Sequence, residues 1–201
     1  MRTRVTLVVS LLTLGACAVP ACAQIGFPGG NAPFLTTFGD GVQIYKSGSN
    51  GLGGFQWNFF APSANLFSDS TETLLVGTHF VGPSWQYAAD GSTVVGAKIG
   101  QLASPNPNSI PQLLLVAKSH SGSGLFDNVS YIQRLNTFDG LAPSMVPTAL
   151  NQEADVHYTA TYVFAKATPE PGPLALLSGA GVALLGFALR RRRRPAKLPV
   201  G

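Results

Sequence analysis

The chain has 201 residues, of which 11% are charged, about half the share of an ordinary globular protein. An apolar content of 45% is enough to build a core and excludes wholesale disorder, and the glycines lack the three-residue period of collagen. The net charge of +4 comes from the two ends, since the interior holds five basic residues against all nine acidic ones. The length fits one domain plus extensions, and the acidic interior gives no reason to expect a nucleic-acid partner.

Residues 1–23 have the pattern of an export signal. A basic start precedes an apolar run over 5–14, and small residues end at Ala23, where signal peptidase would cleave before Gln24. A second interpretation stays open, because residues 14–17 resemble a lipobox in which Cys17 would be lipidated. Both cysteines of the chain, Cys17 and Cys22, lie in this leader, so the cleaved chain would contain no disulfide, Cys-ligated zinc or thiol nucleophile.

Residues 168–194 combine three features in a fixed order. The prolines around Pro169-Glu170-Pro171 keep the chain extended, and the uncharged stretch 173–189 is 17 residues long, close to the minimum for a transmembrane helix. Clustered arginines behind such a helix are expected to stay in the cytoplasm. They are Arg190, Arg191, Arg192, Arg193 and Arg194, and residues 195–201 would form a short cytoplasmic tail.

This tail resembles the PEP-CTERM sorting signal. The resemblance implies recognition of Pro169, Glu170 and Pro171 by an exosortase, a membrane transpeptidase of Gram-negative-type bacteria that make extracellular polysaccharide. It implies a protein that meets signal peptidase, resides transiently in the inner membrane and ends at the cell surface or in the extracellular matrix. A plain C-terminal membrane anchor is the alternative.

The body, residues 41–167, is predicted to be all-β, an antiparallel β-sandwich or a barrel-like sheet. Its apolar segments are short and are separated by Gly, Pro, Asn and Ser at close intervals. Alternation is clearest near the end, where Tyr158, Ala160, Tyr162 and Phe164 share one face of a strand. Residues 24–40, rich in Gly, Pro and Phe, are expected to be a loosely structured lead-in.

Several motifs in the body resemble domain of unknown function 3455. They include Gly41-Val42-Gln43-Ile44-Tyr45, Val76-Gly77-Thr78-His79-Phe80 and Tyr131-Ile132-Gln133-Arg134-Leu135. Members of that family are mostly small secreted proteins without an established activity, so the resemblance implies a fold and no mechanism. Family members often carry two cysteines where this chain has Lys46-Ser47 and Ser144-Met145, and any disulfide between those places is absent here.

Candidate catalytic groups in the body are His79, His120 and Asp90. No two histidines have the spacing of zinc ligands, so no metal is expected. Glycine patterns for nucleotide binding are incomplete, and no cofactor is expected. A nucleophile elbow is also missing, although a Ser-His-Asp triad needs only three residues that meet in space.

Aromatic side chains beside Asn, Gln and Asp can stack on sugar rings, and Trp57, Trp85 and Tyr87 are the candidate ligand-binding residues. Arg134 alternates with apolar residues and is interpreted as a solvated side chain or a partner of Asp127 or Asp139. Together these observations predict an exported surface or matrix protein with a structural or glycan-binding body, which could contact extracellular polysaccharide. A secreted hydrolase with a histidine-based site is the alternative.

Overall fold

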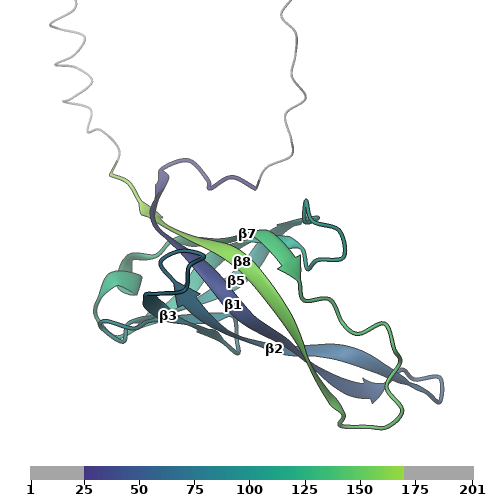
Figure 1. Ribbon diagram of the computed structural model, residues 1–201. Coiled ribbons are helices and arrows are strands. Elements are labelled where there is room, and N and C mark those ends of the chain that lie inside the picture. Colours follow the sequence, from purple (N-terminus) through teal and green to yellow (C-terminus); the bar gives the residue numbers. More distant parts are fainter. Residues whose placement is uncertain (1–24, 170–201) are drawn as a thin grey trace, which may run out of the picture.

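Eight antiparallel strands follow one another around a closed barrel in the computed structural model, which describes residues 25–169 (Figure 1). They are β1 (Asn31–Ser49), β2 (Phe55–Phe67), β3 (Leu75–Phe80), β4 (Ser84–Tyr87), β5 (Thr93–Leu102), β6 (Gln112–Ser121), β7 (Tyr131–Asp139) and β8 (Glu153–Ala167). A single 3₁₀ turn, η1 (Leu125–Asn128), is the only helical element of this region. The all-β, antiparallel prediction is confirmed.

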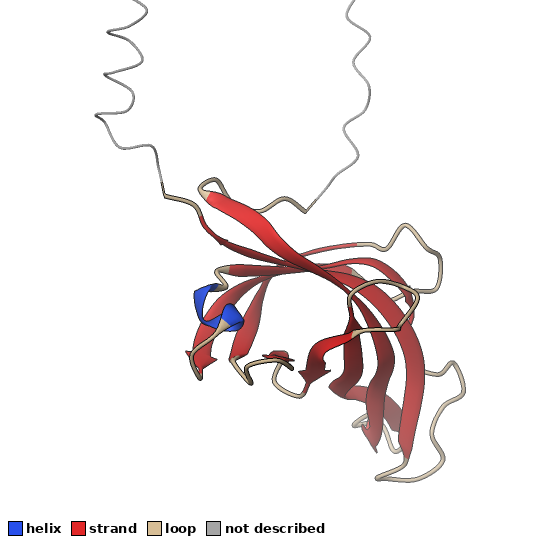
Figure 2. Ribbon diagram, turned by 60° about the vertical axis from the view of Figure 1, so that its left-hand side comes forward, coloured by secondary structure: helices blue, strands red, loops and turns tan. Residues whose placement is uncertain are grey.

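The ring closes because β1 pairs on one side with β2 and on the other with β8 (Figure 2). Of the two architectures that the sequence left open, the hydrogen-bond pattern is that of a barrel. All eight strands and the buried core belong to residues 25–169, so this segment has its own hydrophobic core, as independently folding domains do. We therefore expect it to fold when it is expressed alone.

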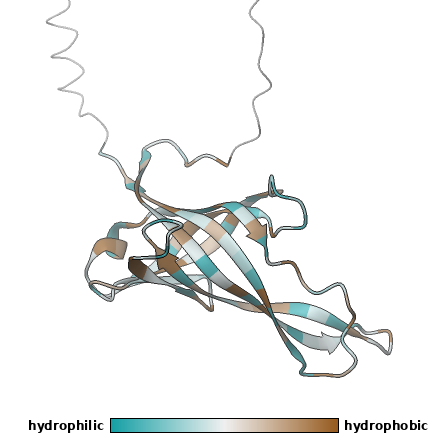
Figure 3. Ribbon diagram, in the orientation of Figure 1, coloured by the Kyte–Doolittle hydropathy of each residue, from teal (hydrophilic) through white to brown (hydrophobic). Residues whose placement is uncertain are grey.

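Side chains alternate between the interior and the outer surface along the strands, and Figure 3 shows the matching alternation of hydropathy. In β8 the predicted inner face is confirmed, because Tyr158, Ala160, Tyr162 and Phe164 are all buried. In β1 the buried positions are polar as well as apolar, since Gln43 lies on the inner face with Tyr45.

The expected lead-in of residues 24–40 is wrong for most of its length, because β1 begins at Asn31 and pairs with β8 throughout. One glycine of this segment, Gly39, has a packing role. A Cβ atom on Gly39 would come within 2.6 Å of the Tyr162 ring, so only glycine allows the strand to approach the core this closely.

The core fills the end of the barrel where the described chain enters and leaves. Phe126 of η1 stacks on Phe164 at 4.6 Å between ring centroids, and both side chains are fully buried. At this end the backbone N–H of Thr168 donates to the carbonyl of Gly30 at 2.8 Å, so the two described termini lie side by side.

The predicted terminal signals lie outside the described residues. These are the leader 1–23 with Cys17, the residues Glu170 and Pro171, the helix 173–189 and the arginines 190–194. Within residues 25–169, no helix has the length and apolar character needed to cross a membrane.

Candidate ligand-binding site

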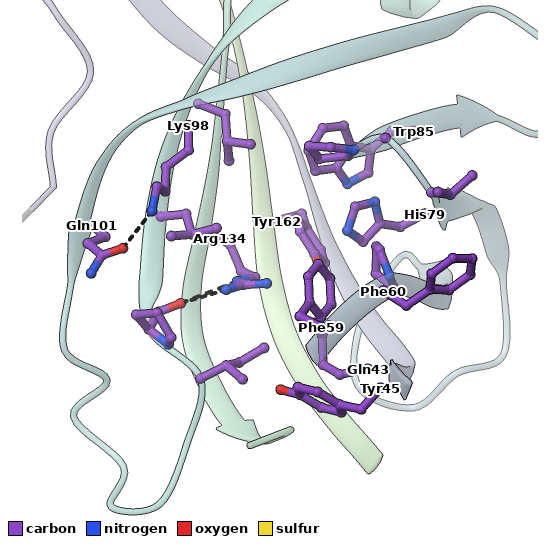
Figure 4. A pocket seen from close by; sticks show the side chains of 18 residues that line it. Gln43, Tyr45, Phe59, Phe60, His79, Trp85, Lys98, Gln101, Arg134 and Tyr162 are labelled. Carbon is purple, nitrogen blue, oxygen red and sulfur yellow. Dashed lines mark hydrogen bonds between the residues drawn. The ribbon is translucent and has the colours of Figure 1, made fainter. Parts of the chain in front are cut away.

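The barrel is hollow at the end opposite its termini. There, a cavity of about 560 Å³ opens between the turn that joins β3 to β4 and the loop that joins β5 to β6 (Figure 4). Strand register explains the location: Asn31 pairs with Ala167 at the filled end, whereas Lys46 pairs with Glu153 at the hollow end. The cavity is lined by Gln43, Tyr45, Phe59, Phe60, Pro62, His79, Val81, Gly82, Pro83, Trp85, Lys98, Gln101, Ile110, Pro111, Leu113, Leu115, Arg134 and Tyr162.

The cavity lining includes exposed apolar side chains at the mouth, as well as the exposed polar side chains of Lys98 and Gln101. A β-bulge in β2 leaves Phe60 as an extra residue, since Ile44 of β1 pairs with Ala61 and Tyr45 with Phe59. The bulge lets both phenylalanines line the cavity, which strict alternation would not allow. Phe59, Phe60 and Val81 are 55%, 52% and 56% exposed, so a large apolar surface faces solvent at the entrance.

An aromatic pair forms the inner wall. The rings of His79 and Trp85 are stacked with centroids 4.4 Å apart and planes 5° apart. His79 Nδ1 lies 2.9 Å from the carbonyl oxygen of Ser84, which assigns the ring proton to Nδ1 in the neutral imidazole. Burial lowers the pKa of His79 to about 3, with the charge of Arg134 adding to the effect, so the ring is neutral at physiological pH.

One cation lies inside the cavity. Arg134 of β7 is 9% exposed, and its Nε and one Nη donate to the carbonyl of Pro111 at 3.3 and 2.9 Å. Its charge also acts on the pKa of Tyr45, His79, Tyr158 and Tyr162, which surround it. No carboxylate lines the cavity, and none within residues 25–169 forms an ion pair with Arg134.

Two tyrosines and one amide add further buried polar groups. The hydroxyls of Tyr158 and Tyr162 lie 2.9 Å apart, and burial raises the pKa of both phenols, so both stay protonated. Gln43 is 2% exposed, and its Nε2 has no hydrogen-bond acceptor within the described chain. A buried amide donor without an acceptor costs free energy unless another molecule supplies one.

The candidate catalytic residues do not meet in this cavity. His79 lines it, but the ring bonds a backbone carbonyl rather than an acid or hydroxyl. His120 Nε2 contacts the carbonyl of Val129 at 2.8 Å, and it forms no ion pair with a carboxylate of the described residues. Asp90 accepts hydrogen bonds from Ser92 and from the backbone of Leu125, which lower its pKa and fix the turn before β5 against the start of η1. Asp90 therefore has a structural role here.

The remaining histidine has an acidic neighbour but no pocket. His157 Nε2 lies 3.2 Å from Asp40, and the His157 side chain is 60% exposed on the outside of the barrel. Within residues 25–169, no group of three His, Cys, Asp or Glu side chains could hold a metal ion.

The three candidate aromatic residues occupy different surroundings. Trp85 is 1% exposed and lines the cavity, whereas Tyr87 packs against Phe126 in the core at 5.7 Å between centroids. Trp57 lies outside the cavity and donates its indole N–H to the carbonyl of Met145 at 2.8 Å, which holds the long loop between β7 and β8. The three do not form one stacking surface.

Arg134 and Gln43 are the functional candidates that sequence reasoning missed. The interpretation of Arg134 as solvated, or as paired with Asp127 or Asp139, is wrong, because the side chain is buried without an ion pair among the described residues. A local signal was present: Arg134 is two residues from Ile132, which is fully buried, and residues two apart share a strand face.

Comparison with known proteins places the whole barrel in one family. A family model described as "Protein of unknown function (DUF3455)" matches residues 28–166, from just before β1 almost to the end of β8. No curated protein and no solved structure matches the chain significantly. The protein belongs to the DUF3455 family.

Proposed function

We propose that this protein is a non-enzymatic binding protein that holds a small, largely apolar molecule inside its barrel. The observation that carries the proposal is the distribution of the core: aromatic side chains fill one end, and the other end encloses a cavity of about 560 Å³. Ligand sites of roughly 300–1,000 Å³ with apolar walls and a few polar groups are typical of small-molecule binding proteins.

The chemistry of the cavity favours binding over catalysis. His79 is neutral and bonds a backbone carbonyl, and neither His120 nor Asp90 lies at the cavity. A general base must reach the proton that it abstracts, and no described acid or hydroxyl forms such a pair with a histidine in the cavity. The hydrolase alternative therefore has no observation in its favour.

Glycan binding by the body is supported less well than binding of an apolar ligand. A sugar-binding surface would need exposed aromatic platforms beside polar groups, whereas Trp57, Trp85 and Tyr87 are separated. The aromatic side chains that do converge, at the cavity mouth, are phenylalanines among other apolar residues.

We propose further that the protein is exported and sorted to the cell surface or matrix, on the basis of the sequence of residues 1–23 and 168–194. The two described termini lie side by side at the end of the barrel opposite the cavity mouth, and this arrangement is consistent with such a route. The mouth would then face away from a membrane that holds the tail. Sequencing of the exported protein should find Gln24 first; a lipidated Cys17 would establish the alternative leader.

The binding proposal can be tested with residues 25–169 and N-phenyl-1-naphthylamine, a neutral dye that fluoresces when it enters an apolar site. We expect saturable binding, and we expect Leu113→Trp to weaken it, because the larger indole side chain would occupy part of the cavity. Leu114→Trp is the matched control, since the neighbouring Leu114 does not line the cavity. Absence of saturable binding, or equal loss in both variants when both are folded, would contradict the proposal.

A further inference from the structure

We infer that the ligand of the cavity is an amphipathic carboxylate, with its carboxylate on Arg134 inside the barrel and its apolar part directed to the mouth. The inference rests on the proposed function and specifies the class of ligand. It is argued from three features: an uncompensated buried charge, unsatisfied buried donors and the exposure of the apolar side chains at the mouth.

The first feature is the charge of Arg134. Within residues 25–169 its hydrogen-bond acceptor is a neutral oxygen, the carbonyl of Pro111. Buried charges in proteins are normally paired, because taking an ion out of water costs more than neutral partners return. Eight of the nine acidic residues lie in the described region, and none of these supplies the counter-charge. An anion brought by the ligand would supply it.

The second feature is the number of donors that face the cavity. Guanidinium has five N–H groups in a fixed plane, of which two donate to the carbonyl of Pro111. N–H donors therefore remain, and two adjacent N–H groups match the two oxygens of a carboxylate. Gln43 adds a buried amide Nε2 without an acceptor on the neighbouring wall. The indole Nε1 of Trp85, another lining residue, is also buried without an acceptor. All three groups are donors, so the missing partner is an acceptor.

The third feature is the difference in exposure between these buried polar side chains and the apolar side chains at the mouth. Arg134 and Gln43 are 9% and 2% exposed, whereas Phe59, Phe60 and Val81 at the mouth are each more than half exposed. A ligand that satisfies both regions must insert its anionic group first and leave its apolar part among these side chains. This orientation separates an amphipathic acid from a sugar acid, whose hydroxyl groups would face apolar walls without partners.

Lys98 is the second cation of the lining and serves as the internal comparison. It is exposed, and its Nζ donates to Gln101 Oε1 at 2.9 Å, so its charge is both solvated and hydrogen-bonded. A carboxylate gains little from a solvated cation, because water screens such pairs. Arg134 is therefore expected to contribute more than Lys98 to the binding of an anion.

The test compares decanoate with 1-decanol, which has the same chain length without the charge. The barrel segment 25–169 carries Trp57→Phe, so that Trp85 in the cavity wall is the only remaining tryptophan and its fluorescence reports occupancy. We expect decanoate to bind at least about tenfold more tightly than decanol, as a charge-assisted hydrogen bond implies. Arg134→Met should bring the two affinities together, and Lys98→Met should change their ratio by less than about threefold.

The outcomes separate this inference from the proposed function. Equal binding of decanoate and decanol, a preference that survives in Arg134→Met, or preferential binding of galacturonate over decanoate would overturn the carboxylate inference while leaving a binding cavity. Failure of decanoate, decanol and the neutral dye alike would overturn the proposed function itself. If Arg134→Met does not fold, ¹³C NMR of carboxyl-labelled decanoate decides: the pKa of the bound acid should fall below that of the free acid, and an unchanged or raised value contradicts the inference.

Discussion

The imidazole of His79 lies flat on the indole of Trp85, and its Nδ1 contacts the carbonyl oxygen of Ser84 at 2.9 Å. Both rings are buried, His79 at 4% exposure and Trp85 at 1%. The pair therefore gives the inner wall of the cavity a flat apolar surface, and it holds the imidazole where protonation is strongly disfavoured.

The first prediction concerns the pH dependence of stability. His79 has a folded pKa of about 3, well below the ordinary 6.5, so protons bind preferentially to the unfolded chain between these values. The contribution of the neutral ring is complete above pH 6.5 and is lost as the pH falls toward 3. We expect the free energy of unfolding to drop by about 2–3 kcal/mol between pH 6.5 and 4.5. This is close to the largest change that the protonation of a single group can cause over two pH units.

Urea denaturation of residues 25–169 at the two pH values measures this drop in the free energy of unfolding. In the His79→Gln variant most of the drop should disappear. The carboxyls of Asp69 and Asp90 have pKa values below the ordinary 3.8. They contribute little to the drop, because the stability that such groups provide is lost mainly below pH 3.8. A drop of the same size in His79→Gln would show that another group is responsible.

A second prediction concerns the close approach of β1 to the core. Gly39→Ala would place a methyl group 2.6 Å from the Tyr162 ring, and we expect a loss of about 1–3 kcal/mol in the free energy of unfolding. Gly26→Ala is the matched control, because nothing lies within 4 Å of a Cβ atom there. Chemical denaturation measures both, and a neutral Gly39→Ala would mean that the ring moves aside without cost.

The inner face of β8 was predictable, whereas the first half of β1 was not, for a physical reason. Tyr158, Ala160, Tyr162 and Phe164 alternate with other residues, and alternation is a local signal. Residues 31–40 become a strand because they pair with β8, which is more than a hundred residues away in sequence. The composition of residues 24–40 as a whole, rich in glycine, proline and phenylalanine, indicates a loose segment and gives no sign of the partner strand.

The candidate site could be predicted even less well than the first half of β1, because it forms only when the strands close into a barrel. The register of β7 with its neighbours brings Arg134 opposite Leu113 of β6 and Tyr162 of β8, and closure of the barrel places all three in the lining of one cavity. Strand alternation could have assigned Arg134 to the face of Ile132, but it could not show that this face encloses an empty space. That property depends on the sum of side-chain volumes around the whole ring.

A third prediction concerns the proposed sorting signal. Glu170 is the only acidic residue near the expected exit of the tail from the membrane, and under the sorting proposal Pro169-Glu170-Pro171 would be the recognised segment. We expect Glu170→Ala to leave an unprocessed, membrane-bound chain in a host that has an exosortase, as followed by fractionation and immunoblot.

Glu153→Ala is the control for this experiment, because Glu153 is an exposed acid at the start of β8 and should not alter processing. Replacement of Arg190–Arg194 should disturb the topology of the tail instead. If the unaltered chain stays unprocessed in that host, a simple C-terminal anchor replaces the sorting proposal.

The most direct measurement is a crystal structure of residues 25–169 with 10-bromodecanoate, located by the anomalous scattering of its bromine. We expect a bromine peak at the cavity mouth beside Phe59 and Phe60, with the carboxylate within hydrogen-bond distance of Arg134. A bromine atom deep in the barrel against Trp85, or a ligand bound only on the outer surface, would contradict this binding mode.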